Sequence, residues 1–164
     1  MSDVGTLCLS CGLCCDGTLF GLVRVDAAEA AHAARHRLAV VTRDDGVMRL
    51  AQPCNALDGT ACRIYGDRPQ TCRHYLCDLA RALEEDELGL DEASSVVDET
   101  KRLRDTLAAA LGPDDAPHLR RRLQQRARDA HRPLVGEPLS DGALATLAAL
   151  EEQLDHVFRG RRGR

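Results

Sequence analysis

Eight cysteines are the residues of this sequence best suited to chemistry, and they fall into two groups of four. The first group has the spacing C-x2-C-x2-C-C, and the second has the spacing C-x7-C-x9-C-x4-C. The members of the two groups are Cys8, Cys11, Cys14 and Cys15, and Cys54, Cys62, Cys72 and Cys77. Thiolate is a soft ligand that selects zinc, Cu(I) or iron–sulfur clusters over hard cations. The sequence therefore predicts metal ligation by these cysteines.

The first cysteine group fits two kinds of metal centre. Cys8-Leu9-Ser10-Cys11-Gly12 is similar to a zinc-ribbon knuckle, in which Gly12 permits the turn after the second ligand. Cys8, Cys11 and Cys14 also reproduce the C-x2-C-x2-C run that binds a [4Fe–4S] cluster, although the Cys-Pro that continues a ferredoxin run is missing. The expected cofactor is therefore an iron–sulfur cluster or Zn, with a lean towards iron–sulfur.

The adjacent pair Cys14 and Cys15 bears on the number of metal sites. Neighbouring side chains point in different directions in most backbone conformations, so this pair serves two metals, or two parts of one site, more easily than one tetrahedral ion. Two four-coordinate sites fit eight thiols, and so does one site plus a free or reactive pair. If two sites form, ligands can be shared between the groups instead of following chain order.

Basic and aromatic residues surround the second cysteine group. A tetrathiolate zinc or oxidised [4Fe–4S] site carries a formal charge of about −2, which nearby arginine donors would offset. We therefore predict Arg68 and Arg73 as cofactor-binding residues.

His74 has the chemistry of a ligand, but eight thiols already meet the ligand need, so an exposed histidine is the better interpretation. Tyr65 and Tyr75 are expected to pack over the site. The remaining histidines, which lack ligand spacing among thiols, are interpreted as surface residues: His32, His36, His118, His131 and His156.

Composition excludes several classes of protein. A chain of 164 residues with 44% hydrophobic and 29% charged residues is ordinary for one soluble globular domain, or one domain with an extension. No run approaches the roughly 18 apolar residues of a membrane span, and the first residues lack the pattern of an export signal. We therefore expect a cytoplasmic protein with no membrane partner and with reduced cysteines. Because aromatic residues are only 2%, the metal is expected to help hold the fold together.

Charge is unevenly distributed along the chain. The net charge is −4, with 9 basic and 17 acidic residues in 1–100 and 13 basic and 9 acidic residues in 101–164. The whole chain is thus not a polyanion binder, and a nucleic-acid partner is disfavoured. The arginine-rich segment 115–131 and the basic tail 159–164 keep open the alternative of an adaptor that binds a protein or a nucleic acid.

Local patterns predict the elements that position the cysteines. Asp26 is expected to cap an Ala-rich helix that runs to about Arg37. Asp44-Asp45-Gly46 predicts a hairpin turn, and the Asp58-Gly59-Thr60 turn suggests that Cys54 and Cys62 lie on loops. Short strands are expected at 22–25, 38–42 and 47–50.

The remainder of the chain has helical periodicity. Helices are expected at 76–88, 95–111, 115–131 and from 140 onwards. Gly89 is expected to stop the first of these helices, while Ser95 and Ser140 are expected as N-caps. The last helix is expected to bury Leu144, Leu147, Leu150, Leu154 and Phe158. The predicted fold is a small α+β one, with a loop-rich metal module at 1–80 and a helical extension at 81–164 that packs on it.

The cysteine pattern resembles the YkgJ family, also called CxxCxxCC, a zinc- or iron-chelating domain. The resemblance lies in the double-Cys run, in Cys62-Arg-Ile-Tyr65-Gly-Asp-Arg68-Pro69-Gln-Thr-Cys72-Arg73, and in the closing Cys77. It covers roughly residues 7–80. The resemblance implies that all eight cysteines chelate metal, and it assigns no reaction. Members linked to flagellin lysine methylation are known, but this chain has no Gly-rich motif for a bound methyl donor.

Three functions follow from these patterns. The first is a metal-binding protein whose metal organises residues 8–77. The second is an iron–sulfur oxidoreductase or electron carrier. The third is the metal-stabilised adaptor. Spacing alone identifies no catalytic residue and no substrate.

Overall fold

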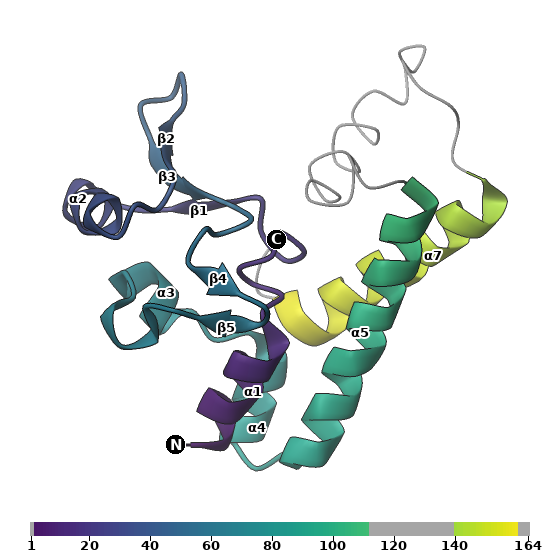
Figure 1. Cartoon of the computed structure of the whole chain (residues 1–164). Helices are drawn as coiled ribbons and strands as arrows, with labels where there is room; N and C mark the ends of the chain where they lie inside the picture. The colour runs from purple at the N-terminus through teal and green to yellow at the C-terminus, as the bar shows by residue number, and fades with distance from the viewer. Residues whose placement is uncertain (1, 112–139, 161–164) are drawn as a thin grey trace.

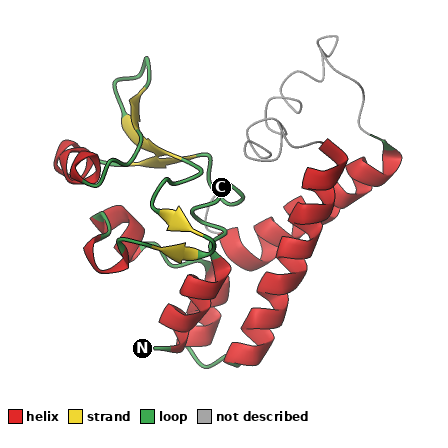
Figure 2. Cartoon of the chain, viewed as in Figure 1, coloured by secondary structure: helices red, strands yellow, loops and turns green. Residues whose placement is uncertain are grey.

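A computed structural model of the chain describes residues 2–111 and 140–160. Two small antiparallel sheets and a set of helices make a mixed α+β architecture, which confirms the predicted fold class (Figures 1 and 2). The helices are α1 Asp3–Cys11, α2 Ala27–Arg35, α3 Gln70–His74, α4 Asp78–Glu84, α5 Leu90–Leu111 and α7 Asp141–Gln153, with a 3-10 turn η1 Tyr65–Asp67 and a π-helical segment η3 Leu154–Arg159. The strands are β1 Leu22–Arg24, β2 Val40–Thr42, β3 Met48–Ala51, β4 Leu57–Asp58 and β5 Ala61–Cys62.

The predicted hairpin is confirmed as β2 and β3. These strands pair antiparallel with Val40 opposite Leu50, and β1 pairs with the other edge of β3, which gives the order β1-β3-β2. Gly46 adopts a φ of 71° in the turn, and its N–H donates to the Arg43 carbonyl at 2.8 Å. The Asp-Gly signal was sufficient because this turn requires a left-handed residue at that position.

Helix α2 begins where its cap predicts. Asp26 accepts from the N–H of Glu29, and the Glu29 carboxylate accepts in return from the N–H of Asp26. The helix ends at Arg35, two residues before the predicted Arg37, because Arg37 has a left-handed φ of 58°. The N–H groups of Arg37 and Leu38 then satisfy the last helical carbonyls.

Two predictions about the cysteine segments are wrong. The stretch from Cys8 to Cys11 is the end of helix α1, not a zinc-ribbon knuckle, although Gly12 does turn the chain with a φ of 72°. Ser2 caps this helix by accepting from the N–H of Gly5. Cys62 lies in the short strand β5 instead of a loop, while Cys54 is in a loop as expected.

The boundaries of the middle helices also differ from prediction. Helix α4 ends at Glu84, and Asp86 has a left-handed φ of 56°, so Gly89 is not its stop. Gly89 instead precedes α5 and accepts from the N–H of Ala93. Ser95 is inside α5, where its hydroxyl donates back to the Asp91 carbonyl, so it is not an N-cap.

The C-terminal helix starts at the predicted cap but buries a different face. Ser140 accepts from the N–H of Ala143 at 3.2 Å, which confirms the N-cap. Leu144 is 48% exposed, so its predicted burial is wrong, and Ala143 faces the core in its place. Leu150, Leu154 and Phe158 are buried as predicted. The predicted helix 115–131 and residues 161–164 of the basic tail lie outside the described residues.

The apolar residues form two cores, one in the helices and one under the sheet. The larger core joins α1, α4, α5, α7 and η3, and contains Phe158 at 1% exposure. The smaller core lies between α2 and the β1-β3-β2 sheet. Helix α5 contacts α1 and α4, η3 contacts α4, and α7 contacts α5 (Figure 1). The division into a module at 1–80 and an extension at 81–164 stays a prediction. None of the described helices combines the length and the apolar character needed to cross a bilayer.

Candidate metal centre

Helix α1 and the turn after it position the first cysteine group. Cys8 and Cys11 are three residues apart on α1, which places their side chains on one face of the helix. Gly12 ends the helix against the β4–β5 hairpin, where a Cβ on this glycine would lie 3.1 Å from the Cα of Thr60. The Cys15 N–H donates to the Gly12 carbonyl, so Cys14 and Cys15 occupy a tight turn beside that hairpin.

The second cysteine group comes from four different local structures. Cys54 lies in the loop before β4, Cys62 in β5, Cys72 in α3, and Cys77 at the N-terminus of α4. The N–H of Cys54 donates to the carbonyl of Cys15 at 2.7 Å, which brings this group against the first. All eight cysteines are free thiols, and each is partly buried.

The fold divides the eight thiols differently from the sequence. Cys11, Cys14 and Cys77 pack against the helical core, whereas Cys54, Cys62 and Cys72 pack against the sheet core. Negative charge on Cys8 acts on Cys11 and Cys77, so Cys8 joins the first three. We call these four the helical thiol set: Cys8, Cys11, Cys14 and Cys77. We call the other four the sheet thiol set: Cys15, Cys54, Cys62 and Cys72.

Electrostatic coupling follows the same division. Desolvation raises the pKa of Cys11 to about 12, and negative charge on Cys77 and Cys8 would raise it further. Desolvation also raises the pKa of Cys15 to about 12, with added effects from Cys54, Cys62 and Cys72, all in the sheet thiol set. The one resolved effect between the sets joins the chain neighbours Cys14 and Cys15. These electrostatic effects therefore group the thiols in the same way as their packing does.

Both thiol sets open on one cavity of about 320 Å³. Seven of the eight cysteines line it, Cys54 being the exception. Tyr65 and Tyr75 line it too, and Tyr75 stacks edge-on against Phe20 with ring centroids 4.9 Å apart. Burial raises the pKa of the Tyr75 hydroxyl, as would thiolate charge on Cys14 and Cys77. The cavity is thus mainly apolar, apart from its sulfurs and a few polar groups.

The thiols are spaced more widely than those of a closed zinc site. A tetrahedral zinc with Zn–S bonds of about 2.3 Å holds its sulfurs roughly 3.8 Å apart. Among residues 2–111 and 140–160, groups of three or more ligand atoms all within 4.8 Å of one another occur only at His32, His36 and Asp67. No three of the eight Sγ atoms are therefore that close together.

The two predicted arginines face different surroundings. The Arg68 guanidinium lies 3.7 Å from the centroid of the Tyr65 ring. Burial raises the pKa of both Cys8 and Cys72, and the positive charge of Arg68 offsets part of that rise. Arg68 therefore lies near both thiol sets. Arg73 instead donates to the carbonyls of Arg68 and Gly66, at 2.9 and 2.6 Å. His74 is exposed, as expected.

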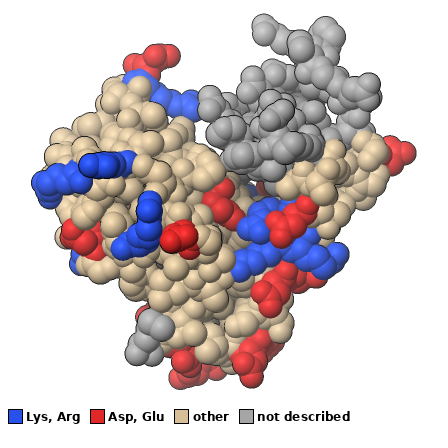
Figure 3. Space-filling view, in the orientation of Figure 1, with Lys and Arg blue, Asp and Glu red and all other residues tan. Residues whose placement is uncertain are grey.

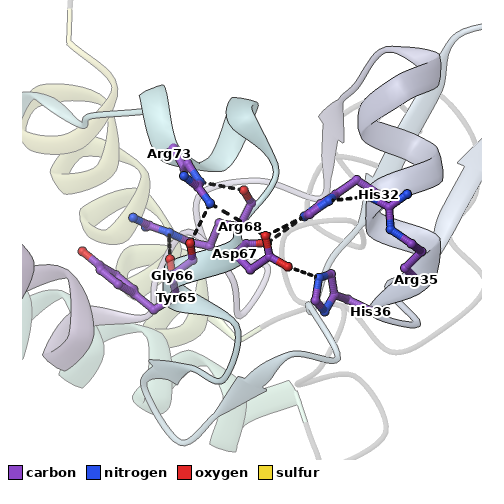
Figure 4. Close-up of polar contacts among 8 residues, drawn as sticks. All are labelled: His32, Arg35, His36, Tyr65, Gly66, Asp67, Arg68 and Arg73. Carbon is purple, nitrogen blue, oxygen red and sulfur yellow. Dashed lines mark hydrogen bonds and ion pairs between the residues drawn. The ribbon is translucent and has the colours of Figure 1, made fainter.

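Two histidines that the sequence predicts at the surface, His32 and His36, lie close together in the structure. His32 and His36 lie four residues apart on α2, and both contact Asp67 (Figure 4). The helical spacing of the two histidines was visible in the sequence. Their approach to an aspartate 31 residues further along the chain was not.

Of the two basic segments proposed for an adaptor, 115–131 and 159–164, only residues 159 and 160 are described. On the face in Figure 3, Lys and Arg side chains are interspersed with Asp and Glu. Arg159 of the predicted tail pairs with Glu151 and Asp155, so in the described part this arginine is neutralised within the chain.

Comparison with known proteins identifies the family of this chain. Residues 7–95 match the family model CxxCxxCC, described as "Putative zinc- or iron-chelating domain". This chain belongs to the CxxCxxCC family. The match includes all eight cysteines and confirms the resemblance seen in the sequence. Searches of the curated proteins and of the solved structures found no match. Membership of the CxxCxxCC family indicates metal chelation and leaves the choice between zinc and iron open.

Proposed function

We propose that this protein binds two iron–sulfur clusters, one in the helical thiol set and one in the sheet thiol set. The observation that carries the proposal is the spacing of the thiols. No three sulfurs lie within 4.8 Å of one another in the described chain, whereas a single zinc ion needs four sulfurs about 3.8 Å apart. The irons of a cluster lie at separate corners and bind more widely separated thiolates.

The volume between the thiols supports the same proposal. The cavity of about 320 Å³ is bounded by sulfurs of both sets and by apolar side chains. Apolar walls reduce the solvent exposure of a bound cluster, which is one of the factors that set its reduction potential.

Charge in the site also fits anionic clusters. A set of four thiolates is unstable by itself, since burial and mutual repulsion raise the pKa of these thiols. A metal cluster supplies the compensating positive charge. Arg68 lies beside both sets, and the charge of Lys101 offsets part of the rise that burial causes in the pKa of Cys11. Both cations would offset the remaining negative charge. The cluster-loaded protein would act in electron transfer in a reducing compartment such as the cytoplasm.

The test is the metal and sulfide content of the full chain purified without oxygen. With two [4Fe–4S] clusters, about eight iron and eight sulfide per chain are expected, with a broad visible absorption band and a Mössbauer spectrum of tetrathiolate clusters. His74→Ala is the control, and it should keep the full iron content because His74 is exposed. A colourless protein with about two zinc ions and no sulfide would overturn the proposal.

A further inference from the structure

A second cluster of ligand-type side chains lies between α2 and η1. His32 and His36 project from α2 towards Asp67 at the end of η1 (Figure 4). His36 Nε2 lies 2.7 Å from Asp67 Oδ2, and His32 Nε2 lies 3.6 Å from Asp67 Oδ1. The three ligand atoms all lie within 4.8 Å of one another. These residues contribute nothing to the thiol sets, so any function of theirs is separate from the proposed clusters.

We propose that His32, His36 and Asp67 form a binding site for a divalent transition metal such as Zn²⁺, independent of the cysteines. Two imidazole nitrogens and one carboxylate suit this class of ion, and three protein ligands leave a position for water. With metal–ligand bonds of about 2.0–2.2 Å, neighbouring ligand atoms in such a site lie roughly 3.0–3.5 Å apart. The observed distances of 2.7 and 3.6 Å run to different oxygens of Asp67, and one ligand atom from each residue lies within 4.8 Å of the others. An ion would therefore draw these ligand atoms towards a common centre.

Access and charge are both suitable for an ion from solvent. The side chains of His32 and His36 are about a quarter exposed, and that of Asp67 is 61% exposed. The hydrogen bond from His36 and the positive charges around it lower the pKa of the Asp67 carboxyl, so the carboxylate is the form present at neutral pH. The Arg73 guanidinium lies 3.9 Å from Asp67 Oδ1, so its positive charge would repel a bound cation.

Arg35 determines which ring nitrogen of His32 carries the proton in the metal-free site. Its guanidinium donates to His32 Nδ1 at 3.0 Å, and since arginine has no acceptor, Nδ1 must carry the lone pair. The proton of His32 is then on Nε2, which donates to the Asp67 carbonyl at 2.8 Å. Ligation by His32 Nε2 requires that proton to move to Nδ1, with no net proton change. The proton that His36 Nε2 donates to Asp67 Oδ2 must move to His36 Nδ1 in the same way. Arg35 must release His32 Nδ1 for the first of these moves to occur, so Arg35 opposes metal binding.

The test uses the full chain with its cysteine sites filled by their own metal, titrated with Zn²⁺. Isothermal titration calorimetry should detect one additional Zn²⁺ per chain, and long-range ¹⁵N–¹H NMR should show the His32 proton moving from Nε2 to Nδ1. His36→Gln and Asp67→Asn keep a hydrogen-bonding partner but remove a ligand, so each should weaken this binding at least ten-fold with unchanged circular dichroism. Arg35→Ala should tighten it.

Controls make each outcome decisive. His156→Gln removes an exposed histidine outside the cluster and should leave the affinity unchanged. The proposal is overturned if no additional Zn²⁺ binds, or if the two ligand variants bind it as tightly as the wild type. Neither result depends on whether the cysteines hold clusters or zinc, because the iron and sulfide content of the starting protein is measured separately.

Discussion

The N–H of Cys54 donates to the carbonyl of Cys15 at 2.7 Å, so two cysteines 39 positions apart are joined through their backbones. This bond fixes Cys15 beside the sheet thiol set, while Cys14 stays with α1 and Cys77. The division of ligands between two proposed clusters therefore falls between adjacent residues of the chain. One ligand is exchanged between the two sequence groups, Cys15 for Cys77.

Paired serine variants test this division. Cys14→Ser and Cys77→Ser should each lose about half of the iron, since each removes a ligand from the same proposed cluster. The double variant of Cys14 and Cys77 should lose no more than either single change. Combining Cys77→Ser with Cys72→Ser should remove nearly all iron, because these residues belong to different sets. If Cys72 and Cys77 instead behave as one unit, the ligands follow chain order and the division is wrong.

The pKa values of the thiols predict that the metal-free protein loses unfolding free energy at alkaline pH. Burial raises the pKa of Cys11 and Cys15 from 9.0 to about 12. Between these pH values the unfolded chain has lost its thiol protons while the folded chain still holds them. The free energy of unfolding is therefore largest below pH 9.0 and falls as the pH rises towards about 12.

Urea unfolding of the metal-free protein, followed by circular dichroism at neutral and alkaline pH, measures this effect. The metal-loaded protein is the control, because bound thiolates do not titrate in this range and its stability should change little. Equal pH dependence in the two forms would contradict the prediction.

Gly12 should resist substitution more strongly than another left-handed glycine. Both Gly12 and Gly46 have a positive φ, of 72° and 71°. A Cβ at Gly46 would meet nothing within 4 Å, whereas at Gly12 it would approach the backbone of Thr60 at 3.1 Å. Gly46→Ala should cost about 1 kcal/mol of unfolding free energy from φ strain alone, and Gly12→Ala about 2 kcal/mol or more.

Thermal unfolding of the two variants measures the difference, and iron content gives a second readout. Gly12→Ala should also reduce iron loading, since the displaced turn carries cysteines of both thiol sets. Equal destabilisation by the two variants would mean that the close approach to Thr60 is unimportant.

Glu29 should stabilise the segment that carries Cys72. Its carboxylate accepts from the Thr71 N–H at 2.6 Å and from the Thr71 hydroxyl at 2.9 Å, and so ties α2 to α3. Glu29→Ala leaves these donors, and the Asp26 N–H that the same carboxylate caps, without their partner. It should cost about 1–3 kcal/mol of unfolding free energy. Because Cys72 follows directly, the variant should also lose metal from the sheet thiol set.

Glu152→Ala provides the matched comparison, because Glu152 is an exposed helical glutamate on α7. Its unfolding free energy, measured by urea titration, should change by about 0.5 kcal/mol or less. If Glu29→Ala destabilises the protein no more than Glu152→Ala does, the bond to Thr71 is not a structural link.

The sequence by itself determined the features that depend on residues a few positions apart. The Asp26 and Ser140 caps, the hairpin turn at Gly46 and the metal-chelating cysteine pattern were all predictable, because each is a local hydrogen bond, a required φ or a ligand type. Tertiary structure decided the rest. The exchange of Cys15 and Cys77 between the groups depends on a backbone hydrogen bond across 39 positions. The contact of His36 with Asp67 depends on how α2 packs against η1. Helix α7 turned Leu144 outwards because its buried face is set by its neighbours, and such long-range packing has no periodic signal in the chain.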